Sequence, residues 1–428
     1  MRRFDAADPG FDAAFDDFLA EPRGAPADVE AAVTAIIAAV RAEGLPALLR
    51  FTREFDGAEL TEETLRVTAE EIDAGVAQCP SDIREALIFA ATRIADYHRR
   101  LAPADARYTD AAGVQLGWRW TALDAVGIYV PGGRAAYPST VLMNAVPARL
   151  AGVARIAMVT PPGRLEPAVL AAAKQAGVTE IWRVGGAQAV AALAYGAGPI
   201  APVVKIVGPG NAYVTAAKRR LHGVVGIDAL AGPSEIVVVA DAANDPAWIA
   251  ADLLSQAEHD PDAQAILITD DAAFADAAIA AVTAQLATLA TARAAAASWS
   301  AHGAVVVAPL SRAAALVDRI APEHVELAVA DPEALATTVR NAGAIFLGRH
   351  APEAIGDYVA GPNHVLPTSR AARFSSGLST LDFMKRTSII KCDASAFAAL
   401  AGPTSILALA EGLPAHARSV DLRRNRAN

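Results

Sequence analysis

Gly127-Ile128-Tyr129-Val130 is an apolar run of strand length, and a helical pattern follows it from Ser139 to Leu150. The same alternation continues downstream, with further apolar runs at 155–159, 181–184 and 203–207. Because connections long enough to hold a helix join parallel strands, this pattern predicts a parallel sheet built from βαβ units. After a run at 236–239 the pattern repeats at 265–268, 304–307 and 344–347. The sequence therefore predicts an α/β fold with two Rossmann-like parallel sheets.

The regions that flank these sheets have a different pattern. Residues 1–25 form an acidic segment in which Phe4, Phe11, Phe15 and Phe18 recur at intervals of three to seven. This spacing predicts an amphipathic helical arm that needs a surface to pack against, and another subunit is one candidate. Residues 28–101 also have a helical pattern, and no residue in that stretch suggests chemistry.

Composition narrows the class of protein. The 428 residues, of which 54% are hydrophobic, are enough for more than one domain with a large core. The formal net charge of −10 comes without a basic stripe, which argues against nucleic acid as a partner. No apolar segment suits a signal peptide or a membrane span, because acidic residues follow Met1-Arg2-Arg3 and polar residues interrupt the alanine-rich run 272–297. The two cysteines, Cys79 and Cys392, favour a cytoplasmic protein in which N and O ligands hold any metal.

Two metal-capable side chains stand three residues apart in Ser255-Gln256-Ala257-Glu258-His259-Asp260. On a helix this spacing would put Gln256 and His259 on one face, close enough to share one ion. The same spacing is also common among exposed residues that bind nothing. Asp357, within Gly356-Asp357-Tyr358, offers a carboxylate ligand, although an aspartate beside a glycine often only stabilises a turn.

Glycine-rich turns follow three of the predicted strands, at Pro131-Gly132-Gly133, Gly185-Gly186 and Gly208-Pro209-Gly210. Such turns let main-chain N–H groups and a helix N-terminus approach a pyrophosphate. None of the three completes the dinucleotide-binding fingerprint, because Tyr213 occupies the third glycine position, and βα turns without a ligand also use glycine. Nucleotide binding and simple turn formation both remain open from spacing alone.

Glu323 and His324 follow Pro322 as an adjacent acid and base. On a helix, neighbouring residues point about 100° apart, so the pair is expected to serve two tasks instead of forming one hydrogen-bonded dyad. A histidine is suited to take a hydroxyl proton near neutral pH, and a glutamate can polarise a water. The alternative is a solvent-facing glutamate beside a helix-capping histidine.

In combination these motifs resemble the histidinol dehydrogenase family over nearly the whole chain from about residue 25. The resemblance is carried by Gly-Ile-Tyr-Val-Pro-Gly-Gly at 127–133, Gly-Gly-Ala-Gln at 185–188, Val-Gly-Pro-Gly-Asn at 207–211, Ala-Pro-Glu-His-Val-Glu at 321–326 and Glu-Gly-Leu-Pro-Ala-His at 411–416. It implies NAD-dependent oxidation of L-histidinol through L-histidinal to L-histidine, the last step of histidine biosynthesis. The alternatives are a related zinc dehydrogenase for another small alcohol, such as a sulfonated diol, a zinc hydrolase and a nucleotide-binding module.

The resemblance also implies roles for individual residues. Glu323 and His324 would be catalytic, and Tyr129, Gln188 and Asn211 would contact NAD. One Zn²⁺ per subunit would be held by Gln256, His259, Asp357 and the partner subunit's His416. The implied substrate contacts are Ser234, Gln256, His259, His324, Asp357, His364, Glu411 and His416.

The resemblance, together with the pattern along the chain, also implies a domain organisation. Residues 1–25 form the arm, 26–125 and 236–380 form a discontinuous α/β domain with most metal and catalytic residues, and 126–235 form the NAD-binding domain. Residues 381–428 form an extended tail that is exchanged in a homodimer and contributes to the partner's active site. No role is assigned to the arm or to Thr368–Ser376.

Overall fold

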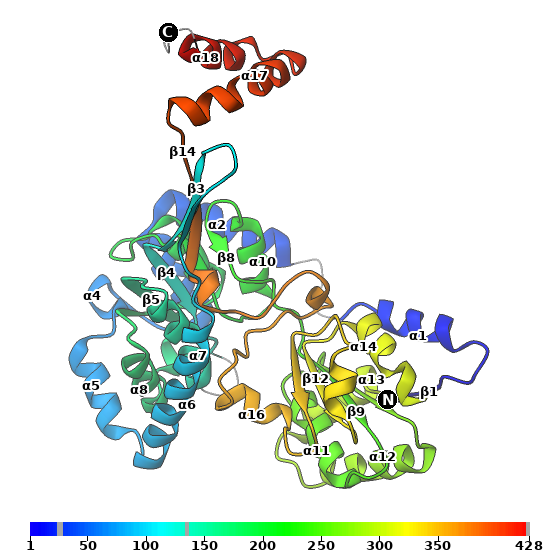
Figure 1. The fold of residues 1–428 in the computed structure, drawn as a ribbon. Helices are drawn as coiled ribbons and strands as arrows, with labels where there is room; N and C mark the ends of the chain where they lie inside the picture. The colour runs from blue at the N-terminus through cyan, green and yellow to red at the C-terminus, as the bar shows by residue number, and fades with distance from the viewer. Residues whose placement is uncertain (24–28, 133–136, 425–428) are drawn as a thin grey trace.

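A computed structural model describes residues 1–23, 29–132 and 137–424 (Figure 1). Gly133 of the first glycine-rich turn and residues 425–428 of the expected tail lie outside the described residues. Two parallel sheets, each with its own helices, form the body of the molecule, and a smaller antiparallel sheet leads to the C-terminal helices. The predicted α/β class with two parallel sheets is therefore confirmed.

The first sheet has five parallel strands in the order β6-β5-β4-β7-β8. Its central strand, β4, is buried along its whole length, as the apolar run at 125–129 requires. The strands are β4 (Ala125–Tyr129), β5 (Arg155–Thr160), β6 (Glu180–Arg183), β7 (Lys205–Val207) and β8 (Gly226–Ile227). The connecting helices are α7 (Pro138–Leu150), α8 (Pro167–Ala176), α9 (Gly186–Tyr195) and α10 (Ala212–Leu221).

The second sheet has six parallel strands in the order β1-β11-β10-β9-β12-β13. They are β1 (Arg2–Asp5), β9 (Glu235–Ala240), β10 (Gln264–Thr269), β11 (Ala304–Val307), β12 (His324–Ala328) and β13 (Ala344–Leu347). The helices that accompany this sheet are α11 (Pro246–Ala257), α12 (Ala272–Leu286), α13 (Ala292–His302), α14 (Ala313–Ile320), α15 (Pro332–Ala336) and α16 (Glu353–Tyr358). Strands β9, β10 and β12 are buried throughout, so they form the centre of this core.

The N-terminal segment packs on its own chain. Residues 2–5 pair in parallel with β11. Helix α1 (Phe11–Ala20) buries Phe11, Phe15 and Phe18 in the core on one face of the second sheet. The prediction of an all-helical arm is wrong for residues 2–5, which form an edge strand, and the surface that α1 covers is not another subunit. Periodicity revealed the apolar side of this segment, but it carries no information about which surface that side covers.

The helices before β4 cover the first sheet. They are α2 (Val29–Glu43), α3 (Leu45–Asp56), α4 (Glu62–Leu65), α5 (Ala69–Gln78) and α6 (Ser81–Arg100). Helix α2 contacts α9 and α10, and α6 contacts α7 and α8, so both helices share a core with 126–235. This packing differs from the expected grouping, in which 26–125 belonged with 236–380. Side-chain pattern identifies the buried face of a helix but not the sheet that buries it.

A three-stranded antiparallel sheet joins the body to the C-terminus, in the order β14-β3-β2. It is formed by β2 (Ala106–Thr109), β3 (Gln115–Ala122) and β14 (Met384–Lys391). Figure 1 shows α17 (Ala394–Ala410) and α18 (Pro414–Arg424), drawn in red, standing beyond this sheet and away from both parallel sheets. Short 3₁₀ turns occur at Pro162–Arg164, Leu310–Arg312, Ala371–Arg373 and Thr380–Phe383. The tail is therefore extended, as predicted.

Two further expectations concern the whole chain. Of the helices in the described ranges, none is both long and apolar enough to cross a bilayer. Cys79 is buried and Cys392 exposed, and neither forms a disulfide.

Candidate active site

The site is built around the start of β12, where Glu323 and His324 are both buried. The expectation that this pair lies on a helix is wrong, because His324 is the first residue of a strand between β9 and β13. Nδ1 of His324 lies 3.7 Å from Oε2 of Glu323, which is longer than a hydrogen bond. The geometry therefore agrees with two separate tasks for the two side chains, although the pair lies at the start of a strand and not on a helix.

Hydrogen bonding sets the tautomer of His324. Its Nδ1 lies 3.2 Å from the main-chain oxygen of Glu235. A carbonyl oxygen only accepts, so Nδ1 carries the proton and Nε2 keeps a free lone pair. Burial, with a smaller contribution from the charges of His259 and His364, lowers the pKa of His324 to about 3. The imidazole is therefore neutral near pH 7, with Nε2 unprotonated.

Glu323 is held by the same neighbouring peptide. Its Oε2 accepts a hydrogen bond of 3.1 Å from the main-chain N–H of Glu235. Burial raises the pKa of Glu323 well above its usual range, and the nearby carboxyl groups of Glu235, Asp357 and Glu353 raise it further. A carboxylate with a raised pKa is a stronger base than an exposed glutamate, which suits it to take a proton from water.

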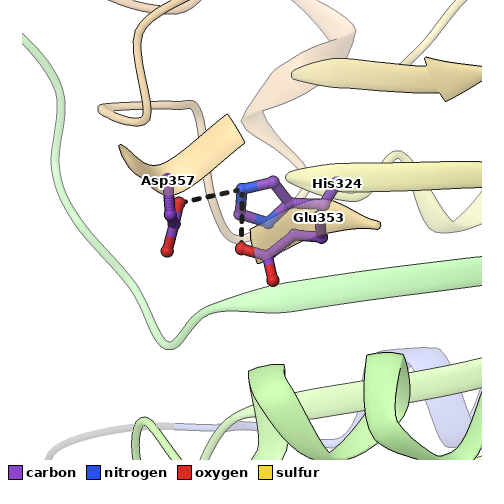
Figure 2. A group of neighbouring side chains, drawn as sticks. All are labelled: His324, Glu353 and Asp357. Atoms are coloured by element: carbon purple, nitrogen blue, oxygen red, sulfur yellow. Dashed lines mark ion pairs between the residues drawn. The ribbon is translucent and has the colours of Figure 1, made fainter. Parts of the chain in front are cut away.

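Two carboxyl groups on α16 face His324, as Figure 2 shows. From Nε2 of His324, Oε1 of Glu353 lies at 3.8 Å and Oδ1 of Asp357 at 4.0 Å. One potential ligand atom from each of these three residues lies within 4.8 Å of the others, which is compact enough for one metal ion. Burial raises the pKa of Glu353 to about 8, with help from the charge of Asp357, and burial also raises the pKa of Asp357 to about 6.

The place of α16 depends on a glycine. A Cβ atom on Gly356 would lie 2.6 Å from the ring of Phe346 on β13. A larger residue would therefore force the ring of Phe346 or α16 itself to shift, and α16 carries Asp357 next to His324.

Glu353 was missed by the sequence analysis. It lies four residues before Asp357 and begins α16, so the two carboxyl groups share one helix face. The i,i+4 spacing was visible in the sequence, but a helix of six residues has too few turns for a periodic signal.

Gln256 and His259 come from the end of α11, which contacts α16. The sequence analysis expected Gln256 and His259 on one helix face. That expectation is wrong, because the helix ends at Ala257 and His259 lies in the following turn. Gln256 is fully buried, and neither its amide oxygen nor its amide nitrogen has a hydrogen-bond partner among the described residues. Leaving a buried amide unpaired is costly, so this side chain fits an absent ligand such as a metal ion.

His259 is exposed at the edge of the same site. Its charge lowers the pKa of His324, His364 and Glu353, which places it in electrostatic contact with all three. Nitrogen, amide and carboxylate donors from Gln256, His259 and Asp357 make a donor set that fits zinc.

Two expected substrate contacts are also close to this cluster. Nδ1 of His364 donates to the main-chain oxygen of Asp357 over 3.0 Å, and burial lowers the pKa of His364 to about 4. Ser234 directly precedes Glu235, the residue whose main chain contacts Glu323 and His324. The fold thus brings Ser234 and His364 to the site from two distant parts of the sequence.

Glu411 and His416 are not brought to the site within the chain. Both are exposed, Glu411 at the end of α17 and His416 on α18. Figure 1 shows these helices at one extremity of the molecule, with β14 between them and the body that carries α16. The site of one chain therefore lacks two of its expected residues.

The three expected NAD contacts lie at the carboxyl end of the first sheet. Tyr129 ends β4, Gln188 lies in the first turn of α9, and Asn211 is the N-cap of α10, where its side chain accepts from two main-chain N–H groups. The chain runs from β4 to β5 and β6 on one side and returns to β7 and β8 on the other. The strand order thus reverses between β4 and β7, and open α/β sheets bind ligands at such a point.

Close approaches shape this end of the sheet. The hydroxyl of Tyr129 accepts from the main-chain N–H of Gly186, and the buried amide oxygen of Gln188 has no partner among the described residues. Gly208 has a φ of +107°, and a Cβ atom there would lie 2.3 Å from the main-chain oxygen of Tyr129. The glycine is therefore required for the turn itself, whether or not a nucleotide binds.

Comparisons with known proteins cover nearly the whole chain. The sequence model of the histidinol dehydrogenase family matches residues 20–424. Histidinol dehydrogenase from Caulobacter vibrioides is 72% identical over 423 residues, which is 99% of each chain. Histidinol dehydrogenase from Rhodospirillum rubrum is 60% identical over 429 residues, again 99% of each chain. The crystal structure of histidinol dehydrogenase from Elizabethkingia anophelis has a TM-score of 0.95 at 34% identity and covers 100% of this chain and 99% of its own.

Proposed function

The chain belongs to the histidinol dehydrogenase family, and on that premise we propose that it carries L-histidinol through L-histidinal to L-histidine in two NAD-dependent steps at a zinc site completed by a second subunit. One observation above all supports this proposal. The neutral imidazole of His324 presents an unprotonated Nε2 toward the carboxyl groups of α16, with Glu323 beside it. An alcohol oxidation that passes through a hydrated aldehyde needs this pairing of two bases.

The donor set for zinc would be Gln256, His259 and Asp357 from one chain, together with the partner subunit's His416. The unpaired amide of Gln256, and the contact of α11 with the helix α16 that carries Asp357, support this assignment. When bound, zinc would hold the amino and imidazole nitrogens of the substrate and so fix the reacting carbon. Glu353 lies close enough to be a further ligand or to contact the positive end of the substrate.

The first sheet would bind NAD at its switch point, with Tyr129, Gln188 and Asn211 as contacts. The turns at 185–186 and 208–210 lie at the carboxyl end of this sheet, where α9 and α10 begin, and a helix N-terminus favours the negative charge of a phosphate. When bound, NAD would accept two electrons and a proton as hydride in each of the two oxidations.

The protein's own groups would then manage the protons. In the first oxidation Nε2 of His324 takes the hydroxyl proton while the carbon loses hydride. Glu323 takes a proton from the water that adds to the aldehyde, and Nε2 of His324 gives its proton to the aldehyde oxygen, which yields the hydrate and leaves the imidazole neutral again. His324 takes a hydroxyl proton again in the second oxidation. Ser234, His364 and the partner subunit's Glu411 would orient the substrate, and burial of both bases excludes other water from the reacting atoms.

We propose a homodimer because α17 and α18 pack against each other and still leave large apolar side chains exposed. Ile406, Leu407 and Leu409 on α17 are 59–69% exposed, an apolar stretch that a monomer would leave in water. Exchange of this tail between two chains would bury these side chains and deliver Glu411 and His416 to the partner's site. A cytoplasmic location is proposed as well, supported by two unpaired cysteines.

The test is an assay for NADH absorbance on mixing the purified protein with NAD and a candidate alcohol. L-histidinol is expected to give two NADH per molecule consumed, with L-histidine as product. A sulfonated diol should give none under the same conditions. Formation of one NADH per histidinol, or activity with the diol alone, would contradict the proposal.

A further inference from the structure

Glu235 contacts both proposed catalytic residues through its main chain. Its N–H donates to Oε2 of Glu323 at 3.1 Å, and its carbonyl oxygen accepts from Nδ1 of His324 at 3.2 Å. The residue begins β9, which pairs in parallel with β12, so the two contacts arise from adjacent strands. One residue therefore orients the carboxylate of Glu323 and the imidazole of His324 together.

The side chain of Glu235 points to the interior, where it forms an ion pair with the guanidinium of Arg23. Only 2% of the glutamate side chain and 13% of the arginine side chain are exposed. The pair joins Nη2 of Arg23 to Oε1 of Glu235, and among the described residues Nη1 of Arg23 and Oε2 of Glu235 have no hydrogen-bond partner. Burial alone raises the pKa of Glu235, and the charge of Arg23 opposes that shift. A buried pair of this kind depends on both members, since removing one leaves a charge without compensation.

Arg23 comes from the N-terminal segment, residues 1–23, and its ion pair with Glu235 links this segment to the peptide that contacts the proposed catalytic residues. Strand β1 and the phenylalanines of α1 anchor this segment to the second sheet. An exposed ion pair between Arg2 and Glu21 joins its two ends, and Arg23 follows two residues later. The anchored segment thus presents the guanidinium of Arg23 from a fixed position.

A second segment reaches the same carboxylate. The main-chain N–H of Arg370 lowers the pKa of Glu235 against the effect of burial, and Ser369 and Arg370 both have positive φ values, 53° and 64°. Non-glycine residues adopt such values at a cost, so the surrounding contacts must hold this turn in place. The carboxylate of Glu235 is therefore held by Arg23, with the turn at Arg370 close by.

We propose that Arg23 and Glu235 are positioning residues of the dehydrogenase site: their buried ion pair lets the N-terminal segment hold the peptide that orients Glu323 and His324. The inference rests on the proposed roles of Glu323 and His324. It gives the N-terminal segment a function that its distance in sequence from the site does not suggest.

The test compares Arg23→Met, Arg23→Lys and Glu235→Gln with Arg2→Met, which breaks the exposed pair in the same segment. Each full-length variant is assayed for kcat and KM with histidinol and with histidinal, for zinc per chain and for thermal unfolding. We expect Arg23→Met and Glu235→Gln to lower kcat at least tenfold with both substrates, while KM and zinc content change less than twofold. Arg23→Lys should keep at least a third of the wild-type kcat, and Arg2→Met should match wild type.

A purely structural ion pair would lower the unfolding temperature and leave kcat per folded molecule unchanged, and that result would overturn the inference. An equal loss of kcat in Arg2→Met would also overturn it, because general anchoring of the segment would then be sufficient. If Arg23→Met fails to fold, Glu235→Gln decides, and a wild-type kcat in that variant refutes the proposal. Normal activity in His324→Ala would instead refute the proposed function.

Discussion

Glu353 and Asp357 lie one helical turn apart on α16, and both carboxyl groups approach Nε2 of His324, at 3.8 Å and 4.0 Å. Together with Glu323 they gather three carboxyl groups around one neutral imidazole in the protein interior. Burial raises the pKa of each of these carboxyl groups, which means that the folded chain alone accommodates their negative charge poorly. A bound cation would relieve that cost, and the same arrangement makes the site sensitive to small shifts of α16.

Replacing Gln256 with Met is expected to abolish zinc binding and to stabilise the metal-free enzyme. The buried amide has no partner among the described residues, so an apolar side chain of similar size removes an unpaired polar group, a gain of about 1 kcal/mol. His259→Ala should also lose zinc, but without this gain, because His259 is exposed. Urea unfolding in the presence of a chelator and zinc analysis provide the two measurements.

Gln264→Met is the matched control. Gln264 is also buried, but its amide nitrogen donates to the main-chain oxygen of His302. The same substitution there should retain zinc and should not stabilise the protein. Stoichiometric zinc in Gln256→Met would remove Gln256 from the proposed ligand set.

Substitutions of Glu323 and His324 should affect the two oxidation steps differently. Glu323→Gln is expected to impair the aldehyde-to-acid step at least tenfold more than the alcohol-to-aldehyde step, because only the former needs water to be activated. His324→Ala should impair both steps, since each oxidation removes a hydroxyl proton. Steady-state rates with histidinal as substrate isolate the second step. Equal losses in both steps for Glu323→Gln would argue against its role with water.

Mixing two inactive variants tests whether the site is shared. In a heterodimer of His324→Ala and His416→Ala chains, one site receives both defects and the other combines intact His324 with the partner subunit's His416. Random reassortment gives roughly half heterodimers, so about a quarter of wild-type activity is expected if the sites act independently. The measurement is activity after denaturation and joint refolding, with mass analysis to confirm heterodimers. A mixture that stays inactive despite confirmed heterodimers would mean that His416 acts within its own chain.

Substituting Gly356 with Ala should displace α16. The added methyl group would lie 2.6 Å from the ring of Phe346, and overpacking of this kind costs about 1–3 kcal/mol. We expect lower zinc content and a lower kcat, both partly restored by the companion change Phe346→Leu. Gly10→Ala is a suitable control, because a Cβ atom at Gly10 would meet nothing within 4 Å. A fully active Gly356→Ala enzyme would show that the position of α16 does not limit catalysis.

The buried side chain of His98 should lower the free energy of unfolding at acidic pH. The ring is fully buried on α6, neither nitrogen has a partner among the described residues, and burial lowers the pKa of His98 to about 4 from 6.5. Between these two pH values His98 is protonated in the unfolded chain but neutral in the folded chain. The free energy of unfolding therefore falls as the pH drops from about 6.5 to about 4. The loss from this residue is at most about 3 kcal/mol.

His98→Leu should remove that contribution. Unfolding free energies measured at pH 7 and pH 4.5 are expected to differ by less in this variant than in the wild type, by about 2 kcal/mol. His222→Leu offers a comparison with a histidine on the surface loop that follows α10. If the pH dependence of His98→Leu matches that of wild type, the buried ring does not titrate as expected.

Much of the fold was predictable because it depends on local pattern. The apolar runs that became β4 and β9 are buried strands of parallel sheets, as their length and the helices between them indicated. The family and its characteristic motifs were also visible in the sequence, because the residues that carry them are contiguous. The extended tail was predicted from the same resemblance.

The partners of each element were decided only by tertiary structure. Nothing in the sequence of α6 shows that it covers the first sheet, or in Phe11–Ala20 that it covers the second, since an apolar stripe fits any apolar surface. Glu353 is absent from the sequence prediction because a six-residue helix carries no periodic signal. Glu235 was unrecognised because its contacts with Glu323 and His324 use main-chain atoms, which every residue possesses. The side chains proposed to react can therefore be named from the sequence. Their orientation depends on segments far apart in the chain, such as the start of β9, that the fold brings to the same place.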